Sequence, residues 1–92
     1  MTEKNIEKLA ENASIIISLR TQIDDIINTT WRAINDDENK GKEKMIPYIT
    51  AYKDVRKALS KAGVHKEDID DYNDRFKNLP WENCGYKIPQ LN

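Results

Sequence analysis

Apolar side chains recur at alternating intervals of three and four residues along the first third of the chain. Such intervals place successive side chains on one face of an α-helix, and they constrain the fold more than any other feature of the sequence. No glycine or proline occurs before Gly41, so nothing interrupts the pattern. We predict one helix over about residues 3–35, with a seam formed by Ile6, Leu9, Ala13, Ile16, Arg20, Ile23, Ile27, Thr30 and Ile34.

The segment that follows the seam is polar and contains Gly41, so residues 36–45 are predicted to form a loop. A second helix is predicted over about residues 47–62. Pro47 suits the first helical position, because its missing backbone N–H would have no partner there in any case. Gly63 can adopt the left-handed conformation that ends many helices, with Val64 packing back on the last turn.

A third helix is predicted over about residues 66–78, and Pro80 stops it. Residues 80–92 show no helical or strand period and are predicted to be extended. The sequence therefore indicates a single all-α domain over residues 1–92, in which a long N-terminal helix packs with an antiparallel helical hairpin and an extended C-terminal tail follows. The predicted core of the hairpin contains Tyr48, Tyr52, Val55, Leu59, Ala62, Ile69, Tyr72, Phe76 and Leu79.

The first helix is too long for a compact domain of this size. Some 33 residues of helix measure about 50 Å, whereas a compact chain of 92 residues is only about 30 Å across. Two outcomes are open: the helix kinks at the poor helix formers of segment 28–30, or a second subunit covers the excess. We favour a homo-oligomer and place its interface at Ile16, Arg20, Ile23 and Ile27.

Arg20 lies in the middle of the most apolar stretch, "SIIISLRTQIDDII", and three roles are open for it. Its methylenes can follow the seam while the guanidinium reaches water or Asp24, one turn further on. As a buried polar seam residue it can instead fix the register and oligomeric state of a helix–helix interface. The third role is that of an anion ligand in a central pocket.

The formal charge of −1 is unevenly distributed. Residues 1–39 carry four basic and eight acidic side chains, whereas residues 40–61 carry seven basic and two acidic ones. Such a polarised molecule is suited to binding. The second helix presents a basic row of Lys53, Lys57 and Lys61 with Arg56 beside it, and the third presents the carboxylate pairs Glu67/Asp71 and Asp70/Asp74. Either both rows are solvated faces, or they complement each other within a chain or between subunits.

The sequence contains few residues of the kinds that catalysis or metal binding requires. One Cys and one His cannot supply a zinc site, which needs three or four such ligands. A Cys84–His65 dyad lacks any flanking support. The loop around Gly41 places Pro47 where a calcium loop has its bidentate glutamate. We therefore expect no enzyme activity, no metal and no cofactor.

The segment "LSKAGVHKEDIDDY", residues 59–72, resembles the core of a helix-turn-helix DNA-binding motif, with Gly63 as the turn glycine and Ile69 in the buried position. The resemblance implies that the third helix would enter the major groove. That helix carries Glu67 and four aspartates, which the DNA phosphates would repel. We therefore expect no measurable binding to duplex DNA at physiological salt.

Trp81 and Tyr86 in the tail have two interpretations. They either cover a thin core or serve as anchors for a protein partner, as Trp and Tyr often do. We place candidate partner-binding residues at Lys53, Arg56, Lys57, Trp81 and Tyr86. The leading functional hypothesis is a non-catalytic protein-interaction module, self-associating and of an accessory or inhibitor type. The alternatives are a helical oligomer that binds an anionic small molecule or nucleotide, and a nucleic-acid binder.

The expected location is the cytoplasm. A lone cysteine cannot form an intrachain disulfide and suits a reducing compartment. The sequence does not open with a basic leader followed by an apolar run, the pattern of a signal peptide, so we expect no signal peptide. No apolar run approaches the roughly 20 residues of a membrane span, so we expect no membrane insertion. Ile, Asn and Lys make up 32 of the 92 residues, which is typical of an AT-rich bacterial or phage genome.

Overall fold

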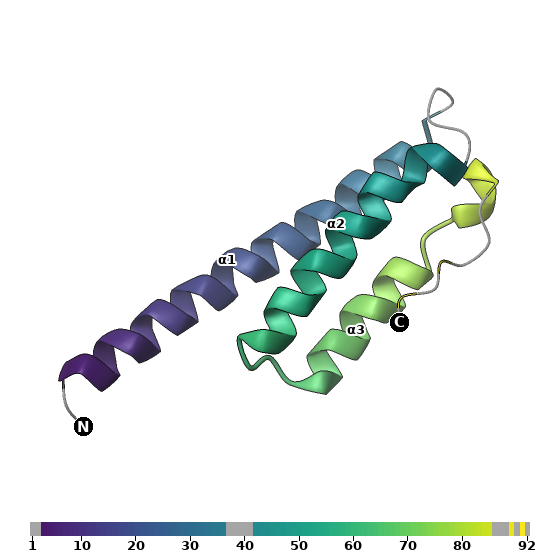
Figure 1. The fold of residues 1–92 in the computed structure, drawn as a ribbon. Coiled ribbons are helices and arrows are strands. Elements are labelled where there is room, and N and C mark those ends of the chain that lie inside the picture. The colour runs from purple at the N-terminus through teal and green to yellow at the C-terminus, as the bar shows by residue number, and fades with distance from the viewer. Residues whose placement is uncertain (1–2, 37–41, 86–88, 90, 92) are drawn as a thin grey trace.

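The computed structural model describes residues 3–36, 42–85, 89 and 91, with side chains from residue 11 onward except at Lys42. Within these residues it contains three α-helices, a single turn of 3-10 helix and no strand (Figure 1). The elements are α1 (Glu3–Ile34), α2 (Lys42–Lys61), α3 (Lys66–Lys77) and η2 (Trp81–Cys84). The predicted all-α class, with a long first helix packed with two others, is confirmed.

The long helix α1 is continuous. It spans 32 residues and passes through segment 28–30 without a break, so the alternative of a helix interrupted there is wrong. Thr30, the polar residue of this part of the seam, is fully buried. Its hydroxyl donates a 2.6 Å hydrogen bond to the Ile26 carbonyl, which satisfies the hydroxyl within the helix itself.

Helix α2 begins at Lys42, five residues before the predicted start, so residues 42–45 are helical and the predicted loop 36–45 is too long. Pro47 therefore lies inside the helix, where it cannot donate the usual hydrogen bond to the carbonyl one turn earlier. The additional N-terminal turn places Met45 in the core, where its side chain is completely buried. Burial of a side chain of this size contributes about 1.5–3 kcal/mol, which offsets the lost hydrogen bond.

The α2–α3 turn has the predicted geometry. Gly63 has a φ of 95°. Its N–H donates to the Ser60 carbonyl and the Val64 N–H donates to the Leu59 carbonyl, both at 3.1 Å, which is the Schellman pattern. Val64 packs against the core. The turn sends α3 back alongside α2, so α3 runs in the same direction as α1 (Figure 1).

The core lies between α1 and α2 and is closed by aromatic rings from α3 and η2. Tyr52 and Phe76 stack with ring centroids 4.0 Å apart. Trp81 meets Phe76 edge to face at 5.1 Å, and its indole N–H donates to the Phe76 carbonyl at 2.8 Å. Trp81 is 1% exposed, which confirms that this part of the tail covers the core.

The tail prediction needs one correction. Trp81–Cys84 form a 3-10 turn rather than an extended strand. Pro80 ends α3, and the indole hydrogen bond of Trp81 folds the chain back over the core before Gly85. Residues 86–88, 90 and 92 lie outside the described residues, so the extended path predicted for them stays a prediction.

The molecule is elongated because α1 is longer than the hairpin beside it. The longest dimension is 54 Å and the radius of gyration is 15.7 Å, compared with about 12 Å for a compact chain of this length. Asn12 of α1 donates a 3.5 Å hydrogen bond to the carbonyl of Ala62, in the α2–α3 turn. The turns of α1 before Asn12 therefore project beyond the hairpin (Figure 1).

Candidate functional site

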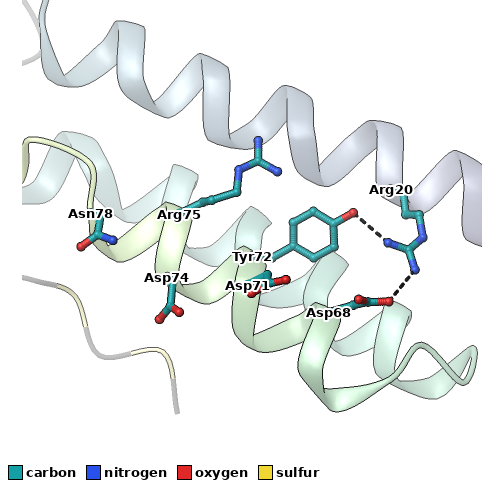
Figure 2. Close-up of a pocket in the computed structure, with 7 residues that line it drawn as sticks. All are labelled: Arg20, Asp68, Asp71, Tyr72, Asp74, Arg75 and Asn78. Carbon is teal, nitrogen blue, oxygen red and sulfur yellow. Dashed lines mark hydrogen bonds and ion pairs between the residues drawn. The ribbon is translucent and has the colours of Figure 1, made fainter.

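Arg20 joins α1 to α3. One guanidinium nitrogen donates to the Tyr72 hydroxyl and the other to the Asp68 carboxylate, each at 3.1 Å (Figure 2). Asp24, which the sequence suggested as its partner, accepts instead from Arg75 at 2.9 Å. The Arg20 side chain is 38% exposed, so its pairing is partly screened by water.

The ring of Tyr72 lies between two cations. The guanidinium carbons of Arg20 and Arg75 are 6.0 Å and 5.7 Å from the ring centroid, within the range of cation–π attraction. The hydrogen bond to the Tyr72 hydroxyl, followed by that to Asp68, raises the pKa of Arg20 above its usual value. Arg20 is therefore cationic at every physiological pH. Within the chain it joins α1 to α3 instead of bonding to Asp24, and its role at an oligomer interface stays a prediction.

A surface depression of about 590 Å³ surrounds these contacts. Two arginines and three aspartates line it together with one tyrosine and one asparagine, so its net charge is negative. Both arginines are already paired: Figure 2 shows Arg20 pointing from α1 toward Tyr72 and Asp68, and Arg75 pointing from α3 toward α1. This arrangement does not suit an anion. The lining residues are Arg20, Asp68, Asp71, Tyr72, Asp74, Arg75 and Asn78.

The basic residues of α2 differ in their burial and in their contacts. Arg56 is half-buried, donates to the Asn73 amide oxygen at 3.4 Å and lies 6.0 Å from the Tyr52 ring. It therefore contributes to the α2–α3 contact, and its assignment as a partner-binding residue stays a prediction. Lys53 is half-buried and Lys57 is exposed, and among the described residues neither forms an ion pair with the acidic row of α3.

Most of the predicted oligomer interface is occupied within the chain. Ile23 and Ile27 are buried in the core, because α2 covers that face of α1. Within the single chain neither is accessible to a second subunit, and Trp81 is likewise buried, so the assignments of these residues to an interface stay predictions. Ile16 remains half-exposed. Tyr86 lies outside the described residues.

The surface does expose large apolar side chains, and the seam analysis missed them. Ile15 is 52% exposed, Ile17 66%, Trp31 52% and, on α2, Ile46 53%. Ile17 and Trp31 are fourteen residues apart, close to four helical turns, so they share one side of α1. The signal was present in the sequence: both are large apolar residues at positions off the 3–4 seam.

The residues considered for catalysis lie far apart. His65 is exposed at the N-terminus of α3, whereas Cys84 is buried in η2, beyond the other end of that helix. Twelve helical residues span about 18 Å, too far for a dyad. The Cys84 thiol donates to the Trp81 carbonyl at 3.1 Å. Among the described residues, no three His, Cys, Asp or Glu side chains are grouped as a metal site would need.

The resemblance to a helix-turn-helix motif ends at the turn. In that motif two helices cross at a large angle. Here α2 and α3 lie side by side, joined by Tyr52, whose hydroxyl donates to the Asn73 amide oxygen at 2.6 Å (Figure 1). In the part of the chain that the structure describes, no helix has the length and apolar character needed to cross a bilayer.

Comparisons with known proteins give no relative of this chain. No protein-family model matches it, and neither the curated proteins nor the solved structures contain a match.

Proposed function

We propose that this protein is non-catalytic and acts by binding another protein chain through the exposed apolar residues of α1, as a small accessory protein or inhibitor. The observation that carries the proposal is the exposure of Ile17 and Trp31 on one side of the long helix α1. Single exposed apolar residues are common on proteins, but two large ones on the same side of one helix offer a surface that a partner can cover. Tryptophan, the residue type at position 31, is enriched among binding hot spots.

The alternative of an anion-binding oligomer receives less support. Arg20 and Arg56 are the cations best placed to bind a phosphate or carboxylate from within the fold, and both are committed to other side chains. The lone cysteine suits a reducing setting, and the proposal therefore includes a cytoplasmic location.

The proposal is tested by affinity capture followed by titration of the purified partner. The wild-type chain is compared with an Ile17→Glu, Trp31→Glu double variant and with a Thr29→Glu control, which places a carboxylate on the opposite side of α1. Any captured protein is purified and titrated against all three. We expect the wild type and the Thr29→Glu control to bind and the double variant to lose at least about tenfold in affinity. Equal affinity for all three chains would contradict the assigned surface.

A further inference from the structure

We propose that a second copy of this chain covers the side of the α1–α2 pair that faces away from α3, with the two copies related by a two-fold axis parallel to the helices. This surface is called the open face. The proposal goes beyond the proposed function, because the open face lies on the side of α1 opposite to Ile17 and Trp31. The open face consists of three residues from each helix: Ile15, Leu19 and Ile26 of α1, and Ala51, Val55 and Ala58 of α2.

Helix α1 carries this line of apolar side chains beside the seam that packs on α2. Ile15, Leu19 and Ile26 are four and seven residues apart, so they share one side of the helix. Ile15 is 52% exposed, and Leu19 and Ile26 are only half-buried against the core. The helical period of about 100° per residue places the line on the side opposite to Arg20 and Asp24, which bond to α3. The line therefore faces away from α3.

Helix α2 carries a matching line. Ala51, Val55 and Ala58 are four and three residues apart, and all are half-buried. The same period places them more than a third of a turn away from Arg56, which bonds to α3. The carbonyl of Ala62, the next position of this line, accepts a hydrogen bond from α1. The two lines therefore lie side by side, and their apolar atoms remain partly exposed to water.

The open face is complementary in shape to a second copy of itself. Its α1 half carries large side chains and its α2 half carries two alanines, and a two-fold axis parallel to the helices places α1 of each copy against α2 of the other. Both copies then keep the same heights along the axis. The hydrogen bond from Asn12 to Ala62 sets these heights, and at about 1.5 Å per residue Leu19 is level with a point midway between Ala51 and Ala58. Leu19 of one copy therefore fits between the two alanines of the other, as a knob fits a hole.

The charges along the edges of the open face also favour this arrangement. The edge of α1 carries Glu11 near one end and Arg32 near the other, the edge of α2 carries Lys61 and Glu43, and all four residues are exposed. The same heights bring Glu11 of one copy within about 3 Å of Lys61 of the other, measured along the axis. They bring Arg32 within about 2 Å of Glu43 in the same measure. Opposite charges therefore meet at both ends, and the two-fold axis repeats each pair.

The other charged residues near the open face meet no like charge in this arrangement. Asp54, on the edge of α2, faces the amide of Gln22, and Asp25, on the edge of α1, is level with Thr50. Lys44 lies in the first turn of α2, and helical side chains tilt toward the N-terminus of their helix. Its ammonium group is therefore directed out of the end of the face.

The open face is large enough for a weak dimer. Helix α2 has 20 residues and is about 30 Å long, and two adjacent helices of about 10 Å diameter make a surface about 20 Å wide. Each copy would bury about 600 Å², and the dimer about 1,200 Å², at the low end for specific interfaces. The turns of α1 before Glu11 lie beyond the end of α2 and take no part (Figure 1). We therefore expect a micromolar dissociation constant.

The first experiment is sedimentation of the full chain over a range from about 1 to 500 µM. The mass should rise with concentration from 10.7 kDa toward twice that value. Ile15→Glu should raise the dissociation constant at least about tenfold, because the dimer would bury a carboxylate without a partner. Ile17→Glu is the matched control: it changes an exposed isoleucine on the opposite side of the same helix and should dimerise as the wild type does. Both isoleucines are more than half exposed, so both variants should keep the circular dichroism and melting temperature of the dilute wild type.

The second experiment exchanges charges across the interface. Glu11→Lys and Lys61→Glu should each raise the dissociation constant about threefold or more, because each brings like charges together at two symmetrical contacts. An equimolar mixture of the two variants should dimerise nearly as the wild type does, since opposite charges then meet at both contacts of the mixed dimer. Lys57→Glu, on the solvent side of α2, is the control and should have little effect.

Three outcomes would overturn the inference. A wild-type chain that stays monomeric at 500 µM excludes the second copy. Equal dimerisation by Ile15→Glu and Ile17→Glu excludes the open face. Charge variants that fail to recover the dimer when mixed exclude the parallel two-fold axis. The proposed function is tested separately, because its capture experiment changes Ile17 and Trp31, which lie outside the open face.

Discussion

Arg20 donates a 3.1 Å hydrogen bond to the hydroxyl of Tyr72, across 52 positions of sequence, and so fastens α1 to the far arm of the hairpin. The contact between α3 and α1 is much smaller than the contact between α2 and α1. The few polar contacts between α1 and α3, from Arg20 and from Arg75, therefore set how α3 lies against α1.

Replacing Arg20 by alanine should destabilise the fold modestly. The change removes the hydrogen bond to Tyr72 and the ion pair with Asp68. Because the side chain is more than one third exposed, solvent screening reduces the contribution of the ion pair, and we expect a loss of about 1 kcal/mol in total. Urea unfolding measures it. Arg32→Ala, at an exposed position of the same helix, should change stability by less than about 0.5 kcal/mol. Equal losses for the two variants would contradict the assigned role.

The fold should lose stability at alkaline pH through Tyr52. Burial raises the pKa of its hydroxyl well above the usual value of about 10. The folded state therefore favours the neutral phenol. The contribution of the neutral Tyr52 hydroxyl to the free energy of unfolding is complete below about pH 10, and it is lost as the pH rises above that value. Urea unfolding between pH 8 and pH 11 should show the decrease.

Tyr52→Phe should weaken that pH dependence. The variant should be less stable at pH 8, because it loses the hydrogen bond to Asn73, yet its stability should decline less between pH 9.5 and pH 11. In the wild type, absorbance at 295 nm should show one of the four tyrosines ionising later than the others. Four tyrosines that titrate together near pH 10 would refute the burial argument.

Gly63→Ala should destabilise the α2–α3 turn by about 1 kcal/mol, because a φ of 95° is unfavourable for a residue with a Cβ atom. No neighbouring atom lies within 4 Å of the added methyl group, so steric clash should not contribute. The measurement is the midpoint of thermal unfolding. Lys61→Ala, in the last turn of α2, should leave the midpoint nearly unchanged. A neutral Gly63→Ala variant would show that the turn can relax.

The two tryptophans should differ sharply in energetic role. Trp81→Ala removes a fully buried indole and should cost about 3–5 kcal/mol, enough to unfold many small domains. The milder Trp81→Phe should remain folded but melt at lower temperature. Trp31→Ala, at a half-exposed site, should cost less than about 1 kcal/mol. Fluorescence of the Trp31→Ala chain should be blue-shifted relative to that of Trp81→Phe, since only the buried indole remains in it.

The sequence predicted those parts of the fold that depend on local spacing. The seam from Ile6 to Ile34 predicted α1, and Gly63 predicted the turn, because helical period and left-handed glycine act within a few residues. Pro47 misplaced the start of α2. The local rule treats proline as a helix start, whereas burial of Met45 is a tertiary effect that sequence spacing does not reveal.

The candidate site was less predictable than the fold. Asp24 is one helical turn from Arg20 and was its natural local partner, yet Arg20 bonds to Asp68 and Tyr72, which are 48 and 52 residues away along the chain. Likewise, the seam has the same spacing at Ile16 and at Ile23, yet Ile16, near the end of α2, is only half-buried, whereas Ile23 is fully buried. Both distinctions depend on where one helix ends relative to another, which a single sequence does not specify.

The unequal length of α1 and its hairpin gives one helix two levels of local stability. Amide protons near Ile27 can exchange with solvent only when the core opens, whereas those before Asn12 need only the fraying of uncovered turns. In dilute solution the rate of amide hydrogen exchange should therefore decrease along α1 from its N-terminal turns toward Ile27, although the helix is continuous. A protease that cuts in those first turns would shorten the rod while leaving the three-helix body intact.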